Sequence, residues 1–268
     1  MPRNLKSTWN AKDGMQPALT LRKKIFANEL TTGLLATDHL WTDLVEVSAR
    51  AGLDYLIVDL EHGPHPSDLV AEVCATGRRM DFPVLIRPRT NDYATLRHAL
   101  DMGACGFLLA SVGSTSELDV VRDALCVPPR GHRRPGGPGN RWVPEFLGES
   151  WRTQVEEPFI VLPQIETLQG MELAEQIARH AVTTALAVGP YDLSAELGVC
   201  GQMQAPILKQ ALQKLLAVAK AANKPMWMIG GNVAELVREG FRFLCIGEPT
   251  YVLEGALKER LAQGKSAL

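Results

Sequence analysis

Three segments of the chain share a pattern in which a predicted helix ends at a glycine and an apolar run follows at once. The glycines are Gly52, Gly103 and Gly240, and the runs after them consist mainly of large apolar residues. Glycine is the residue that most readily takes the left-handed conformation at the end of a helix. Continuous apolar runs are typical of parallel strands that helices cover on both faces. The pattern therefore predicts helices that alternate with the strands of a parallel sheet.

Eight such runs occur in the 268 residues, at 32–36, 55–59, 84–86, 106–109, 160–164, 185–188, 225–228 and 243–246. Helical patterns occupy 42–51, 67–80, 93–102, 115–125, 168–179, 206–223, 233–239 and 251–261, and Ser114 with Glu117 has capping-box spacing before one of them. This α/β alternation suits a single-domain (β/α)8 TIM barrel better than a doubly wound sheet, and no glycine-rich nucleotide motif is present. We expect the barrel at residues 29–268, after an N-terminal extension and leading helix at residues 1–28.

Composition and charge narrow the class of protein. Lys and Arg total 28 and Asp and Glu total 30, so the formal net charge of −2 does not favour binding to nucleic acid. Residues 1–15 lack the apolar centre of a signal peptide, and no apolar run approaches the ~18 residues of a membrane span. Five cysteines without a CxxC pair argue against a disulfide framework or a thiolate zinc site, and we expect most of them to be buried. A cytoplasmic protein with no nucleic-acid or membrane partner is expected.

Polar residues that close the predicted strands are the candidates for chemistry, because the active sites of such barrels lie at the carboxyl ends of the strands. Glu166 follows the fifth strand and Asp192 follows the sixth. Two carboxylates on adjacent strands suit a hard divalent cation that leaves positions open for a chelating 2-oxo acid and stabilises its enolate. For either residue alone, a helix N-cap or a surface ion pair is the alternative.

Arg87 and His62 complete the candidate chemistry. Arg87 emerges from an apolar strand and needs an anionic partner, either a substrate oxygen or the acid of a neighbouring strand. His62 is the natural proton carrier near neutral pH, and Asp59 or another acid could orient it, although a single histidine is often structural. No lysine ends a predicted strand, so the metal route is favoured over a Schiff base. Small residues at other strand ends, such as Ser111, leave room for a ligand.

Six short motifs occur in one order along the chain: Asp59-Leu-Glu-His-Gly-Pro64, Ile86-Arg-Pro88, Leu100-Asp-Met-Gly-Ala104, Pro128-Pro-Arg-Gly131, Gln164-Ile-Glu166 and Gly189-Pro-Tyr-Asp-Leu-Ser194. The ordered set, within residues 30–261, resembles the HpcH/HpaI aldolase family. The resemblance implies a class II, metal-dependent pyruvate aldolase on a (β/α)8 barrel. Such an enzyme reversibly cleaves 4-hydroxy-2-oxo acids to pyruvate, or a related 2-oxo acid, and an aldehyde through an enolate held on the metal.

The resemblance also implies roles for individual residues. Glu166 and Asp192 would be the ligands of Mg²⁺, Mn²⁺ or Co²⁺. Arg87 would grip pyruvate and its enolate, and His62 would act as acid and base through water. Contacts to the substrate are implied for Gln164, Gly189, Pro190, Tyr191 and Ser111.

The resemblance implies a homo-oligomer as well. Family members are usually hexamers built from paired trimers, so a trimer or hexamer is expected. In that assembly Asp101 would reach a neighbour's site near the histidine, and the last helix would be exchanged between subunits. For Asp101 the alternative is an ordinary polar residue near the end of a helix.

Three positions depart from the family pattern where substrate is expected to bind. Ala110 stands where a proline is common, Arg134 where a glycine is usual, and Tyr191 where a small residue precedes the metal-binding aspartate. Residues 128–144 are rich in Pro, Gly and Arg, and we expect them to form a long loop after a strand, at the mouth of the barrel. There Arg133, Arg134 and Arg141 would add positive charge for an acidic acceptor, or they would form a solvated basic loop.

Other functions fit the same candidate residues. One is decarboxylation of oxaloacetate, with or without trapping of the enolate by an acceptor. Another is carbon–carbon lysis of an acyl-CoA on the same barrel. A third, from a different class, is a barrel that binds a 2-oxo acid without turnover.

Overall fold

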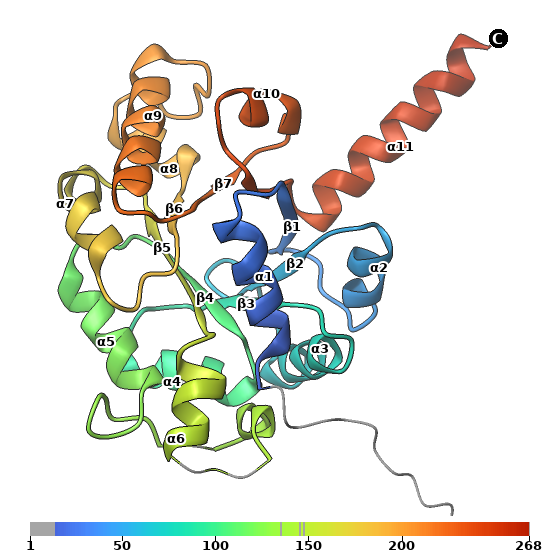
Figure 1. Cartoon of the computed structure of the whole chain (residues 1–268). Helices are drawn as coiled ribbons and strands as arrows, with labels where there is room; N and C mark the ends of the chain where they lie inside the picture. The colour runs from blue at the N-terminus through green and yellow to red at the C-terminus, as the bar shows by residue number, and fades with distance from the viewer. Residues whose placement is uncertain (1–13, 135, 145, 147, 268) are drawn as a thin grey trace, which may run out of the picture.

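The computed structural model describes residues 14–134, 136–144, 146 and 148–267. Eight parallel strands close into a barrel in the order β1 to β8, with helices around it (Figure 1). The strands are β1 (Thr31–Ala36), β2 (Tyr55–Asp59), β3 (Val84–Arg87), β4 (Gly106–Leu109), β5 (Ile160–Ile165), β6 (Leu186–Val188), β7 (Met226–Ile229) and β8 (Phe243–Cys245). The expected (β/α)8 fold is confirmed, and no expected strand end shifts by more than one residue.

The helices alternate with the strands as expected, and four short helices occur in addition. They are α1 (Gln16–Phe26), α2 (Leu44–Arg50), α3 (Ser67–Arg79), α4 (Tyr93–Met102), α5 (Thr115–Leu125), α6 (Gly148–Trp151), α7 (Leu168–Arg179), α8 (Pro190–Glu196), α9 (Pro206–Ala221), α10 (Val233–Arg238) and α11 (Pro249–Ser266). The short helix α8 was not expected, and neither were α6 and its neighbours η2 (Pro138–Trp142) and η3 (Arg152–Glu156). Of the expected N-terminal extension, residues 1–13 lie outside the described residues.

The glycines at the helix ends behave as the sequence predicts. Gly52, Gly103 and Gly240 have φ angles of 86°, 99° and 102°, in the left-handed region that favours glycine. The capping box at α5 is only partly formed. The Glu117 carboxylate accepts hydrogen bonds from the Gly113 N–H at 3.0 Å and the Ser114 hydroxyl at 3.1 Å, and the Ser114 side chain makes no cap bond to the helix backbone.

The barrel interior is filled by side chains from facing strands. The buried Tyr55 hydroxyl donates to the Leu244 carbonyl at 2.7 Å and accepts from Trp227 Nε1 at 2.8 Å, so both polar groups of these large rings are satisfied. Gly33 on β1 makes room for this ring, because a Cβ there would lie 2.5 Å from Tyr55 Cζ. The site at the mouth therefore rests on a closely packed interior.

Helix α1 closes the amino-terminal end of the barrel. Its apolar face, with Leu21 and Ile25, is buried, and Lys24 pairs with Asp54 at 2.5 Å just before β2. Arg22 donates to Thr184 Oγ1 at 2.9 Å just before β6. These contacts leave the opposite, carboxyl-terminal end of the barrel open for a ligand.

The expectation that residues 128–144 build the mouth of this barrel is wrong. The segment follows α5 and precedes β5, so it connects a helix to a strand at the amino-terminal face. Arg133 is buried there and donates to Asp101 Oδ1 at 2.6 Å, on the last turn of α4. Composition predicted a connecting segment, which contains the short helix η2, but the side of the barrel on which it lies depends on whether a helix or a strand precedes it.

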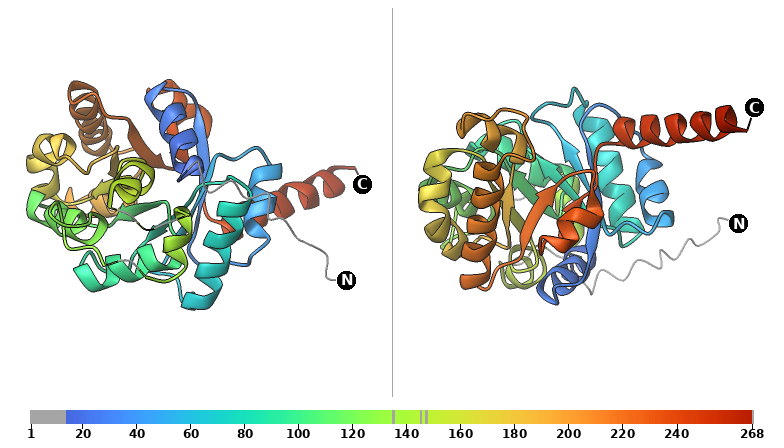
Figure 2. Two further views of the ribbon diagram at one scale, coloured as in Figure 1. Left: turned by 60° about the horizontal axis from the view of Figure 1, so that its bottom comes forward. Right: turned by 90° about the horizontal axis from the view of Figure 1, so that it is seen from above.

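Beyond its first turn, helix α11 does not pack against its own barrel. It has no buried residue, and Figures 1 and 2 both show it projecting away from the other elements. Its exposed apolar residues are Tyr251, Val252, Leu253, Leu257 and Leu261. No helix in the described part of the chain is long and apolar enough to cross a membrane. Of the five cysteines, all but Cys200 are buried, as expected.

Candidate active site

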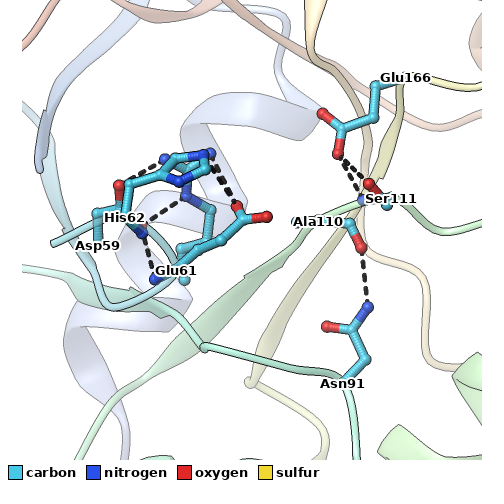
Figure 3. A network of polar contacts seen from close by, with 8 residues as sticks. Asp59, Glu61, His62, Asn91, Ala110, Ser111 and Glu166 are labelled. Carbon is cyan, nitrogen blue, oxygen red and sulfur yellow. Dashed lines mark hydrogen bonds and ion pairs between the residues drawn. The ribbon is translucent and has the colours of Figure 1, made fainter. Parts of the chain in front are cut away.

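The carboxyl ends of β2 to β6 bring most of the predicted site residues to one end of the barrel. Asp59 and Arg87 are paired partners in the register of β2 and β3. Glu166 directly follows β5, and Asp192 lies in the first turn of α8, just after β6. Figure 3 shows Glu166 beside Ser111, across the mouth from Asp59, Glu61 and His62.

Arg87 and Asp59 form a buried ion pair. Arg87 Nε donates to Asp59 Oδ1 at 2.8 Å, and Nη2 donates to Oδ2 at 2.5 Å. Burial works to raise the pKa of Asp59, but the hydrogen bonds and charge of Arg87 outweigh it and hold that pKa below its ordinary value. This forked pair fixes the plane of the guanidinium at the end of β3. Asp59 is thus the acid from a neighbouring strand that the sequence offered as one of two possible partners of Arg87.

The imidazole of His62 faces Glu61 rather than Asp59. Asp59 Oδ1 instead accepts from the backbone N–H groups of Glu61 at 3.0 Å and His62 at 3.4 Å, which holds the loop (Figure 3). Glu61 Oε2 lies 3.8 Å from His62 Nε2 and 3.3 Å from Arg87 Nη1. The His62 side chain is 64% exposed, so it is accessible to solvent and to a ligand.

Glu61 is a candidate that strand-end reasoning left out of the site. It follows Asp59 by two residues in the loop after β2, and its side chain is 26% exposed. Its carboxylate joins the histidine to the arginine, which only the folded loop reveals. The signal in the sequence was its place in the same acidic motif.

Glu166 is a buried carboxylate held by the end of β4. Its Oε1 accepts hydrogen bonds from the Ser111 N–H at 2.6 Å and the Ser111 hydroxyl at 2.7 Å. Burial raises the pKa of Glu166; Ser111 opposes the increase, and the negative charge of Asp192 adds to it. Ser111 has a φ of 53°, unusual for a residue other than glycine, and the Asn91 side chain donates to the preceding Ala110 carbonyl at 2.8 Å. Ser111, which was predicted to contact the substrate, thus binds Glu166, a predicted metal ligand.

Gly189 leaves space beside Glu166 and Gln164. A Cβ on Gly189 would lie 2.2 Å from Glu166 Oε2 and 2.5 Å from Gln164 Nε2, so only glycine fits between β6 and these groups. The Gln164 side-chain oxygen is buried and has no hydrogen-bond partner among the described residues. The Gln164 oxygen is therefore available to a bound group that can donate a hydrogen bond or coordinate it.

The donor set fits a divalent metal ion that retains open coordination positions. No group of three or more His, Cys, Asp or Glu residues in the described part of the chain could hold a metal. Glu166 and Asp192 supply two carboxylates, and a small hard cation such as Mg²⁺ is commonly held by one or two of them plus water and substrate. Asp59, Glu61 and Glu166 all act on one guanidinium, that of Arg87, and Asp192 adds negative charge beside Glu166. A bound cation would balance this excess of carboxylates.

Pro190 and Tyr191 open the helix that carries Asp192. Pro190 is the first residue of α8, where its missing N–H costs no helix bond. Tyr191 is 61% exposed, and its ring lies against the loop after α8, since a Cβ on Gly201 would be 3.6 Å from Tyr191 Cε2. The tyrosine therefore lies at the rim of the site.

Asp101 is not part of the mouth of its own barrel. It lies on the last turn of α4 at the amino-terminal face, where it contacts Arg133 at 2.6 Å and Arg97 at 3.8 Å. His62 lies at the opposite end of the barrel. A role for Asp101 beside a histidine therefore requires a neighbouring subunit and stays a prediction.

Comparisons with known proteins identify the family of this chain. The model of the HpcH/HpaI aldolase/citrate lyase family matches residues 39–252. A hydroxypyruvate/pyruvate aldolase from Chromohalobacter salexigens is 29% identical over 225 residues, which cover 82% of this chain and 88% of that protein. A 4-hydroxy-2-oxo-heptane-1,7-dioate aldolase from Salmonella arizonae is 31% identical over 231 residues, with 80% and 84% covered. The solved HpcH/HpaI aldolase from Desulfitobacterium hafniense aligns with a TM-score of 0.81 and 26% identity over 92% of this chain and 95% of that one.

The matched segment contains each of the residues that carried the resemblance, from Asp59 to Asp192. The expected enzyme class, an aldolase and hence a carbon–carbon lyase, is confirmed. Enzymes of this family depend on a divalent metal ion, which is the expected class of cofactor. The chain belongs to the HpcH/HpaI aldolase/citrate lyase family.

Proposed function

We propose that this enzyme cleaves and forms the C3–C4 bond of 4-hydroxy-2-oxo acids, with pyruvate or a related 2-oxo acid and an aldehyde as the other side of the reaction. The observation that carries the proposal is the pair of carboxylates, Glu166 and Asp192, at the carboxyl ends of β5 and β6, at the same end of the barrel as the Arg87 guanidinium. The named aldolases among the relatives, which act on hydroxypyruvate and pyruvate or on a 4-hydroxy-2-oxo diacid, support this substrate class.

Glu166 and Asp192 would hold the cation, and Mg²⁺, Mn²⁺ and Co²⁺ are the candidates. A bound divalent cation polarises the 2-oxo group and stabilises the negative charge of the enolate. Gln164 would donate a hydrogen bond to a substrate oxygen, since its side-chain Nε2 lies beside Gly189. Ser111 holds Glu166 in place through two hydrogen bonds.

Arg87 would bind the carboxylate or enolate oxygen of the 2-oxo acid. Asp59 fixes the guanidinium through Nε and Nη2, and Nη1 points toward Glu61 at 3.3 Å. A guanidinium held in this way needs little reorganisation as negative charge develops on the substrate. Asp59 acts on substrate only through Arg87 and the loop, and is thus a positioning residue.

His62 would move the proton of the 4-hydroxyl group, directly or through a water molecule. Its exposed imidazole lies beside Glu61, with 3.8 Å between His62 Nε2 and Glu61 Oε2, so it can be reached by the hydroxyl group or by water. In the cleavage direction His62 accepts the proton from the hydroxyl oxygen, and the C3–C4 electron pair stays with the 2-oxo acid. In the addition direction it returns that proton to the new alkoxide.

We also propose that the working enzyme is a trimer or hexamer in which α11 packs on another subunit. The support is its five exposed apolar residues and the absence of any buried residue in the helix. Asp101 would complete a neighbour's site, and Arg134 and Arg141, which do not line their own mouth, would reach substrate only in the same way. The expected cytoplasmic location stays a prediction.

A panel of aldehydes tests the proposed reaction. The full chain is supplied with pyruvate and Mg²⁺, Mn²⁺ or Co²⁺, and new 4-hydroxy-2-oxo acids are scored by mass. Products that require metal and disappear in Asp192→Asn, but not in the exposed control Glu172→Gln, are expected. Carbon dioxide released from oxaloacetate without an aldehyde product would point to decarboxylation instead, and a requirement for an acyl-CoA would point to a lyase of that class.

A further inference from the structure

A second cavity lies on the face of the barrel opposite the mouth. It has a volume of about 270 Å³ and is lined by α1, by the end of α5 and by the segments that enter three strands. Phe159, Thr184 and Lys224 belong to these segments, and they stand just before β5, β6 and β7. The amino-terminal face of such a barrel usually serves stability alone, so the polar character of this cavity needs an explanation.

Two cations line the cavity without an acidic partner. Arg22 uses Nη1 to donate to Thr184 Oγ1 at 2.9 Å and to the Phe159 carbonyl at 3.3 Å. Lys224 donates to the Thr183 carbonyl at 2.5 Å. Within the described part of the chain, neither side chain forms an ion pair with Asp or Glu. Among the described residues, Arg22 makes no hydrogen bond through Nε or Nη2, although its guanidinium lies 5.6 Å over the Phe26 ring, and Lys224 uses one of its three N–H groups.

The acidic residues of the cavity are already engaged. Glu156 is buried, accepts from the Val127 N–H at 2.7 Å and pairs with Arg130 at 3.1 Å. Glu157 pairs with Arg152 at 3.0 Å. The charges of Arg22 and Lys224 thus remain uncompensated on the other side of the cavity.

Burial of these two like charges is unfavourable in the free protein. Burial lowers the pKa of Arg22, and burial together with the positive charge of Arg22 lowers the pKa of Lys224. The groups that accept hydrogen bonds from these two side chains are backbone carbonyls and the Thr184 hydroxyl. These groups carry no net charge, so both positive charges stay unbalanced. A bound anion would accept the free donors and balance both charges.

We propose that Arg22 and Lys224 form a binding site for a small oxyanion with two negative charges, of the phosphate type. The anion would lie between α1 and the entrances to β6 and β7, and would tie the leading helix to the barrel. This site is separate from the catalytic mouth, because it lies beyond the packed interior at the other end of the strands. Its ligand would stabilise the fold or modulate the enzyme without contact to the substrate.

Titration of the full chain with inorganic phosphate by calorimetry, at ionic strength held constant with chloride, tests the proposal. Saturable binding at a single site per chain is expected. Lys224→Met and Arg22→Met should each weaken it by about tenfold or more, as expected for loss of a charged hydrogen bond. Lys220→Met removes the same charge from an exposed position of α9 outside the cavity, and should leave the affinity unchanged.

Thermal unfolding separates a loss of binding from a loss of folding. Phosphate should raise the melting temperature of the wild type and of Lys220→Met, but not that of Lys224→Met, compared with chloride. This comparison holds even if Lys224→Met lowers the melting temperature in both salts. Absence of phosphate binding to the wild-type protein, or equal binding by Lys224→Met and Lys220→Met, would overturn the proposal.

Discussion

Replacement of Ser111 by alanine should weaken metal binding without damaging the reacting groups. The Ser111 hydroxyl donates at 2.7 Å to Glu166 Oε1, and the Ser111 N–H donates to the same oxygen at 2.6 Å. A hydrogen bond to a charged group contributes roughly 1.5–3 kcal/mol, and the lower end applies because the N–H remains. At about 1.4 kcal/mol per factor of ten, metal affinity should fall about tenfold, within the range found for residues that support metal ligands.

Metal titration by calorimetry measures this loss, and steady-state kinetics at several metal concentrations locates its cause. We expect saturating metal to restore kcat in Ser111→Ala, because the variant retains the carboxylates of Glu166 and Asp192. Ser111→Gly is the matched variant: it lacks the same hydroxyl but accepts the φ of 53° more easily. Both variants should lose metal affinity alike, and Ser111→Gly should be more stable than Ser111→Ala by about 1 kcal/mol.

Two results would refute this reasoning. Unchanged metal affinity in both variants would mean that the hydroxyl does not hold the ligand in place. A loss of activity that saturating metal does not restore would assign Ser111 to the substrate, as the sequence first suggested.

Three further predictions concern Glu166, Arg87 and helix α11. Burial raises the pKa of Glu166 above its ordinary 4.5, so the metal-free protein should lose stability as the pH rises through that raised pKa. Metal affinity should increase over the same pH window, and a pH-independent affinity there would contradict this prediction. Arg87→Lys keeps the charge but breaks the forked pair with Asp59, so the KM for pyruvate should rise at least about tenfold and the melting temperature should fall. An unchanged KM and melting temperature would show that the guanidinium fork has no role. Leu257→Asp should reduce the mass measured by light scattering, whereas Gln263→Asp on the same helix should not; equal masses would remove the support for exchange of α11.

The barrel could be predicted from the sequence because its signals are local. Each strand is a continuous apolar run, and Gly52, Gly103 and Gly240 mark helix ends that need a left-handed residue. Helix α8 was missed because residues 189–194 were interpreted only as a motif after the sixth strand, although proline is common at the first position of a helix. The side of the barrel for residues 128–144 was wrong because composition predicts a loop and not its place in the connectivity.

The site could be predicted in part. Strand ends identified Glu166, Asp192, Arg87 and His62 because chemistry on this fold gathers at one end of the strands. The partners of these residues could not be predicted, since they depend on register and on side-chain direction. The Asp59 carboxylate binds Arg87 through the register of β2 with β3, and the contact from Ser111 to Glu166 joins residues 55 positions apart.

Exchange of the C3 hydrogens of pyruvate with deuterium tests the central claim, that the enzyme forms an enolate on a cation held by Glu166 and Asp192. Proton NMR of pyruvate in heavy water measures it without the need to know the aldehyde. We expect exchange of the C3 hydrogens only when divalent metal is added. It should be abolished in Glu166→Gln and retained in the exposed control Glu172→Gln. Undiminished exchange in the metal-stripped protein, or in Glu166→Gln, would contradict it.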